Sequence, residues 1–132
     1  MRLTPTMTAN PANTTGAARP DRLRNGNLPR SERTPDRWFD RTAFALPASF
    51  TFGNAGVNII EGPGLINFDG ALARVFPINE RVRIDFRAEF FNFLNEAQFG
   101  FPNLAVNTAP AGAISATDRP ARQLQFGLKL VF

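Results

Sequence analysis

The chain has 132 residues and a formal net charge of +4, from 15 basic and 11 acidic side chains. It contains no cysteine, no histidine and no tyrosine, but it has 14 phenylalanines. Without cysteine and histidine there is no disulfide framework, no thiolate or imidazole metal site and no imidazole-based catalytic triad. We therefore expect that the chain is not an enzyme and that it binds no metal and no cofactor.

The distribution of charge argues against a nucleic-acid partner. One group of arginines lies in the polar N-terminal third, and the other is interleaved with acids between Arg74 and Arg87. Nucleic-acid-binding proteins usually concentrate their basic residues on one face. Two uncharged stretches, residues 42–60 and 97–117, are interrupted by proline, glycine and asparagine, so we do not expect them to be membrane-spanning helices.

The first half of the chain has few signals of regular structure. Residues 1–35 are rich in Thr, Pro, Ala, Asn, Gly and Arg and have few apolar anchors, which predicts a disordered or loop segment. Residues 36–66 contain the only tryptophan, Trp38, and the turn sequence Gly62-Pro63-Gly64. We interpret residues 36–66 as a loop region of the extracellular type.

Residues 67–132 change in character and predict three strands, at about 67–76, 81–93 and 122–132. The second is the clearest, because every even position from Val82 to Phe90 is apolar and every odd position from Arg81 to Glu89 is charged. Alternation with a period of two indicates a strand with two different faces. We interpret the charged positions as a ladder that faces a water-filled lumen: Arg81, Arg83, Asp85, Arg87 and Glu89.

Two kinds of antiparallel sheet fit this alternation, a soluble sheet with one wet face and a transmembrane β-barrel. An 11-residue strand is about 36 Å long and spans about 26 Å when tilted by about 45°, close to the apolar band of an outer-membrane barrel. The short link at 77–80 and the long link at 94–121 resemble a periplasmic turn and an external loop. Because three strands cannot close a barrel, we expect the rest of the barrel to be missing from this chain.

Several short sequences, taken in order, resemble the C-terminal part of TonB-dependent receptors of the large Oar-like type. The first group is Asn25-Gly26-Asn27-Leu28-Pro29-Arg30, Arg37-Trp38-Phe39-Asp40 and Ala43-Phe44. The second is Phe52-Gly53-Asn54-Ala55-Gly56-Val57-Asn58, Gly62-Pro63-Gly64 and Asn67-Phe68-Asp69. The third is Arg87-Ala88-Glu89-Phe90-Phe91-Asn92, Leu94-Asn95, Phe99-Gly100, Pro102-Asn103 and the final segment from Arg122 to Phe132.

The resemblance implies an all-β fold of antiparallel strands from the C-terminal end of a transmembrane β-barrel, located in the cell outer membrane. Complete members of that family are far longer, with a signal peptide, a carboxypeptidase-regulatory-like domain and a plug. We therefore expect a C-terminal fragment whose intact parent performs energy-coupled nutrient uptake. The alternative is a small soluble β-rich binding or structural domain with a disordered N-terminal arm.

The resemblance also implies partners for the last strand. Its apolar face contacts outer-membrane lipid, and its final aromatic residue is read by the barrel-assembly machinery. The residues of this expected assembly signal are Leu124, Phe126, Leu128, Leu130 and Phe132.

Overall fold

The computed structural model describes residues 1–13 and 18–132, which form two compact units. The first, the loop unit, comprises residues 1–64 and 99–118, and the second, the sheet unit, comprises residues 65–98 and 119–132. Within the described residues there are strands and two short 3₁₀ turns but no α-helix. The all-β fold with antiparallel strands that the sequence predicts is therefore confirmed.

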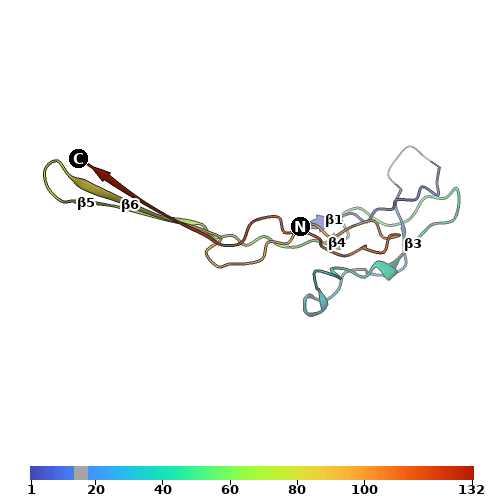
Figure 1. Ribbon diagram of the computed structural model, residues 1–132. Helices are drawn as coiled ribbons and strands as arrows, with labels where there is room; N and C mark the ends of the chain where they lie inside the picture. The colour runs from blue at the N-terminus through green and yellow to red at the C-terminus, as the bar shows by residue number, and fades with distance from the viewer. Residues whose placement is uncertain (14–17) are drawn as a thin grey trace. The chain divides into compact units, whose positions relative to one another are not determined.

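The sheet unit consists of three strands in the order β5-β6-β7, each antiparallel to its neighbour (Figure 1). They are β5 (Gly70–Pro77), β6 (Arg83–Phe91) and β7 (Gln123–Val131). Along β6, Phe90 stands opposite Gly70 of β5 and Leu124 of β7. The three strands are somewhat shorter than the sequence ranges that predict them.

A tight turn over residues 78–82 joins β5 to β6. The Asn79 side-chain oxygen accepts hydrogen bonds from the backbone N–H groups of Arg81 and Val82, at 2.9 and 2.8 Å. The backbone N–H groups of Ile78 and Asn79 both donate to the Val82 carbonyl. Pro77 has no N–H to donate, which is tolerated because it is the last residue of its strand. Arg81, which was expected to begin the charged strand, therefore belongs to the turn.

Asn92 ends β6 at the other end of the sheet. Its φ is 48°, in the left-handed region where asparagine is among the more tolerant residues, so the extended backbone stops there. Its N–H donates to the Asp69 carboxylate at 2.9 Å, and its side-chain nitrogen donates to the carbonyl of Glu96 at 3.0 Å. This buried side chain explains why β6 ends at 91 and does not continue to the expected 93.

The loop unit is built from irregular backbone held by very short pairings. Its elements are β1 (Arg2–Leu3), β2 (Asp21–Arg22), η1 (Arg30–Glu32), η2 (Arg41–Ala43), β3 (Phe44–Ala45) and β4 (Ile60–Glu61). Antiparallel pairs form between β1 and β4 and between β2 and β3. A parallel bridge between Thr6 and Ala105 adds a contact across 99 positions of sequence.

A small apolar core lies inside the loop unit. Its buried members are Leu3, Phe39, Ala43, Phe44, Ile60 and Val106. Residues 1–35 were expected to be disordered or loop; their described part is mostly irregular backbone with the short elements β1, β2 and η1, and Leu3 of β1 belongs to this core. Composition alone underestimated the burial because Leu3 obtains its apolar partners from residues 39–60 and 106, and not from its own neighbourhood. Residues 14–17 of that predicted segment lie outside the described residues.

Candidate functional site

The sheet unit has two chemically different faces, and the strand register determines which residues share each face. On β6 the even-numbered residues are apolar, and they stand opposite the even-numbered residues of β7: Ile84 with Leu130, Phe86 with Leu128, Ala88 with Phe126 and Phe90 with Leu124. Odd-numbered residues occupy the other face. Four of the five residues expected to form an assembly signal thus lie side by side on one apolar face, and Phe132 follows the last residue of β7.

The apolar face is open to its surroundings. On β7 the exposed fraction rises to 64% for Phe126 and 74% for Leu128, and Leu72 and Phe76 of β5 are exposed as well. Phe90 makes an edge-on ring contact with Phe126, with centroids 6.5 Å apart. A contiguous exposed apolar surface of this kind marks contact with a membrane or a partner.

The opposite face carries charges that are paired along β6. The Arg83 Nε atom lies 3.4 Å from the Asp85 Oδ1 atom, and the Arg87 guanidinium donates to the Glu89 carboxylate at 2.6 Å. Asp85 Oδ1 accepts no hydrogen bond, so the ion pair with Arg83 is its polar contact. Four of the five expected ladder residues share this face, and only Arg81 is displaced into the turn.

Small residues leave room in the middle of the charged face. Arg87 stands between Ala73 of β5 and Gly127 of β7. A hollow of about 520 Å³ lies at this level of the sheet, and residues of both faces line it, among them Asp85, Phe86 and Arg87. In a barrel, such a face suits an aqueous or plugged interior, because the charges can stay hydrated or paired.

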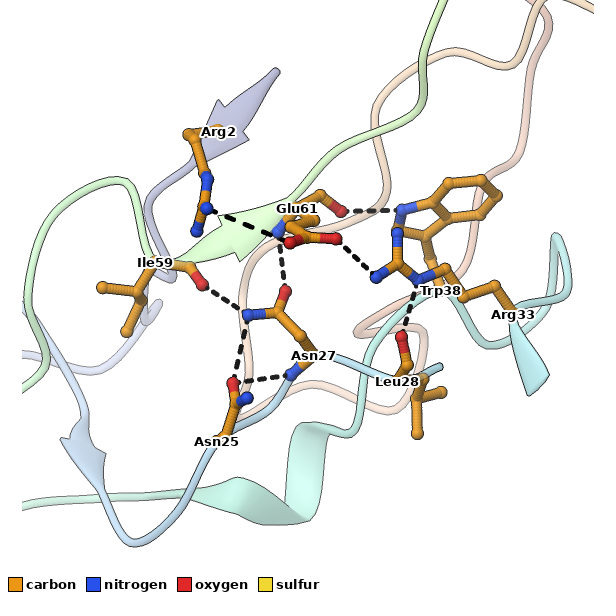
Figure 2. Close-up of polar contacts among 8 residues, drawn as sticks. All are labelled: Arg2, Asn25, Asn27, Leu28, Arg33, Trp38, Ile59 and Glu61. Atoms are coloured by element: carbon orange, nitrogen blue, oxygen red, sulfur yellow. Dashed lines mark hydrogen bonds and ion pairs between the residues drawn. The ribbon is translucent and has the colours of Figure 1, made fainter. Parts of the chain in front are cut away.

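A second polar constellation lies in the loop unit and contains residues on which the family resemblance rests (Figure 2). The Asn27 side chain donates to the Ile59 carbonyl at 2.8 Å and accepts from the Glu61 N–H at 2.7 Å. The amide of one side chain thus pairs with a backbone segment as a neighbouring strand would. Asn25 supports Asn27, because its oxygen accepts from the Asn27 backbone and side chain.

Glu61 joins this constellation to Arg33 and Trp38. The Arg33 guanidinium donates to the Glu61 carboxylate at 2.7 Å and to the Leu28 carbonyl at 2.8 Å (Figure 2). The Trp38 indole N–H donates to the Glu61 carbonyl at 2.9 Å, and the Arg33 guanidinium lies 5.9 Å from the Trp38 ring centroid. Each polar group drawn has a partner inside the unit, so the constellation is structural.

Electrostatics follow these contacts. The hydrogen bond and the charge of Arg33 lower the pKa of Glu61 below its ordinary value. For Asp40, burial acts to raise the pKa, but hydrogen bonds from Thr42 and Arg24 outweigh it and the pKa is lowered. In their charged form, both carboxylates therefore stabilise the folded state.

Sequence reasoning missed two features of the sites. Arg74 lies on the apolar face, opposite Phe86. The second feature is the pairing of Asn27 with residues 59–61, for which the only sequence signal is the Asn25-Gly26-Asn27 motif itself. In the part of the chain that the structure describes, no helix has the length and apolar character needed to cross a membrane.

A sheet with one exposed apolar face, one charged face and alternating short and long connections defines the chain as part of an outer-membrane-type β-barrel. The sequence model of the family described as "Outer membrane beta barrel domain" matches residues 1–125. Because the match covers most of the chain, the chain belongs to this family and is placed in the outer membrane. The match includes the loop unit as well as β5 and β6, which disfavours the alternative of a small soluble domain. No curated protein and no solved structure matches the chain.

Proposed function

We propose that the chain is the C-terminal part of the barrel of a TonB-dependent receptor of the Oar-like type. The intact parent would carry a scarce nutrient inward across the outer membrane, driven by energy from the inner membrane. The large loop unit is the observation that carries this proposal. It is inserted before β5 and between β6 and β7, both times at the end of the sheet away from the 78–82 turn.

This arrangement favours a large transport barrel over a small one. Outer-membrane barrels have short periplasmic turns and longer external loops, and the largest transporters have a plugged lumen. With the 78–82 turn on the periplasmic side, the strand ends that connect to the loop unit are the external ends, which in a receptor continue into the loops that meet the substrate. Residues of the Oar-like motifs, among them Asn27, Trp38 and Phe39, lie in that unit, where Asn27 forms an antiparallel bridge with Phe39.

Reading the genomic DNA upstream of Met1 in the same frame tests the proposal. We expect a continuing open frame with further alternating strands, a plug and a segment that contacts TonB. A stop codon in the same frame just upstream of Met1, together with a ribosome-binding site, would contradict the assignment to a receptor. If the parent is found, uptake by cells should disappear when the inner-membrane energy coupling is removed.

We further propose that the apolar face of β7, together with Phe132, binds the barrel-assembly machinery. Phe132 is 93% exposed and follows a strand whose even positions are all apolar. Replacing Phe132 with Asp in the full-length parent should reduce the amount of assembled barrel. Val131→Asp, one residue earlier on the charged face, is the matched control and should have a smaller effect. Wild-type levels of assembled Phe132→Asp barrel would contradict this role.

A further inference from the structure

Arg74 is the one charged residue on the apolar face of the three described strands. Its position follows from the register, because Arg74 stands opposite Phe86 and Phe86 stands opposite Leu128. The next residues of β5 on the same face are Leu72 and Phe76, which are both apolar and exposed. A guanidinium among lipid-facing side chains requires a counter-charge or water, since Arg is never neutral in proteins.

The described residues offer Arg74 no counter-charge. Both carboxylates of β6, Asp85 and Glu89, lie on the opposite face and are paired with Arg83 and Arg87. Arg74 is absent from the ion pairs formed by the described residues. Its counter-charge, or the water that hydrates it, therefore comes from outside these strands.

The Arg74 side chain extends toward the 78–82 turn. Its guanidinium carbon lies 5.5 Å from the centroid of the Phe76 ring, and Phe76 is two residues closer to the turn. Three residues separate Arg74 from the end of β5, which corresponds to about 10 Å of strand and about 7 Å of depth at a tilt of about 45°. A long arginine stem can cross such a distance while its charged head reaches the membrane interface.

We propose that Arg74 binds the phosphate group of a phospholipid in the membrane leaflet that surrounds the 78–82 turn. The inference rests on the membrane placement of the sheet. The planar guanidinium matches a phosphate with two parallel hydrogen bonds. The Phe76 ring supports the guanidinium on one side, and the exposed apolar side chains of Leu72 and Leu128 provide a surface for the acyl chains. Arg74 and Phe76 would then form a lipid headgroup site on the barrel wall.

The test follows the arginine Nε–H resonances of the ¹⁵N-labelled full-length parent barrel in phosphate-free maltoside micelles during titration with short-chain phosphatidylglycerol. We expect a saturable shift of the Arg74 resonance, identified by its loss in Arg74→Gln, and no shift of Arg87 on the opposite face. Arg74→Gln should weaken phosphatidylglycerol binding about fivefold, the equivalent of about 1 kcal/mol for one basic residue near a lipid surface. Arg87→Gln is the matched control and should leave the affinity unchanged.

Two further titrations separate the sources of the signal. Inorganic phosphate at the same concentration should not shift Arg74, and an equal shift would make this a free-phosphate site and overturn the lipid assignment. A monoacylglycerol without phosphate should also have no effect, and an equal shift would overturn recognition of the headgroup.

A lipid-soluble nitroxide distinguishes failure of this inference from failure of the membrane placement. If the nitroxide broadens the amide resonances of Leu124 and Leu128 but phosphatidylglycerol does not shift the Arg74 resonance, only the headgroup site is wrong. If it leaves these amide resonances unaffected, the apolar face does not contact lipid, and both the headgroup site and the membrane placement of the sheet are wrong.

Discussion

Phe86 of β6 stands directly opposite Leu128 of β7, and both side chains belong to a face that carries no second layer of described residues. Directly opposite apolar side chains stabilise a sheet by contacting each other. Leu128 nevertheless remains 74% exposed, and an apolar face that is exposed to this extent would be unfavourable in water. Contact with lipid removes this cost, and the register of β6 and β7 gathers these apolar side chains on the side that faces lipid.

A charge placed near the middle of the apolar face should therefore disfavour insertion into lipid. Phe126→Arg should cost about 2–4 kcal/mol, the usual penalty for a basic residue near the middle of a lipid-facing strand. Phe126 stands opposite Ala88 and lies two residues further than Leu128 from the end of β7 beside the 78–82 turn. Gln125→Arg, on the charged face of the same strand, should cost less than about 1 kcal/mol. The measurement is urea titration of the vesicle-inserted fraction of the full-length parent barrel. Equal losses for the two variants would contradict the assignment of faces.

The Asn27 side chain should be a strong contributor to the stability of the loop unit. Asn27→Ala leaves the Glu61 N–H and the Ile59 carbonyl without partners, so we expect a loss of about 1–3 kcal/mol. The fluorescence of Trp38, the only tryptophan, reports unfolding in urea because its indole donates to the Glu61 carbonyl. Ser31→Ala, at an exposed position in η1, serves as the control. A urea midpoint of Asn27→Ala that matches the control would show that the pairing is not needed.

The loop unit should lose stability in acid. A carboxyl whose pKa is lower in the folded than in the unfolded chain stabilises the fold above the unfolded pKa, and this contribution is lost as the pH falls through the folded pKa. The ordinary values are 4.5 for Glu61 and 3.8 for Asp40, and both groups have lowered pKa values in the fold. The urea midpoint followed by Trp38 fluorescence should thus be level above about pH 5 and fall below about pH 4.5.

Glu61→Gln is the variant that tests the source of this acid sensitivity. It removes the ion pair with Arg33, so the midpoint at pH 7 should be lower and its decline toward pH 3 shallower than in the wild type. A decline as steep as that of the wild type would assign the acid sensitivity to other carboxylates.

Gly53 should tolerate no side chain, because the backbone of residues 19 and 20 passes very close to it. A Cβ atom at Gly53 would lie 2.0 Å from the Arg19 carbonyl oxygen, and backbone cannot move aside as a flexible side chain can. Gly53→Ala should lower the urea midpoint of the loop unit strongly. Gly64→Ala has no atom within 4 Å of its new Cβ and should leave the midpoint within the error of the wild type. Similar midpoints for both variants would contradict the packing of this segment.

The sequence predicts the sheet well where two strands alternate strictly. In β6 and β7 a period of two assigns each side chain to a face, and the register joins the faces of the two strands, as Ile84 and Leu130 illustrate. The prediction is less complete for β5, whose Gly70-Ala71-Leu72-Ala73 start has no charged alternate and gives a weak periodicity. The position of Arg74 on the apolar face becomes evident only from the pairing with β6.

The loop unit could not be derived in the same way, because its stabilising contacts join residues far apart in the sequence. Leu3 pairs with Ile60, and the Thr8 N–H donates to the Asn107 side chain across 99 positions. No local pattern encodes such pairings. Proline-, asparagine- and glycine-rich composition describes disordered chains and packed loops equally well, and the difference depends on whether distant apolar residues such as Phe39 supply a core.

The most direct test concerns β7, which should cross the outer membrane with its even-numbered side chains toward lipid. The chain contains no cysteine, so single cysteines can be placed at each position from 123 to 130 and tested in the full-length parent barrel in vesicles. A water-soluble maleimide should label the odd positions readily and the even positions poorly, while a quencher attached to lipid acyl chains should give the opposite pattern. Uniform labelling along the strand, or protection without a period of two, would contradict the claim.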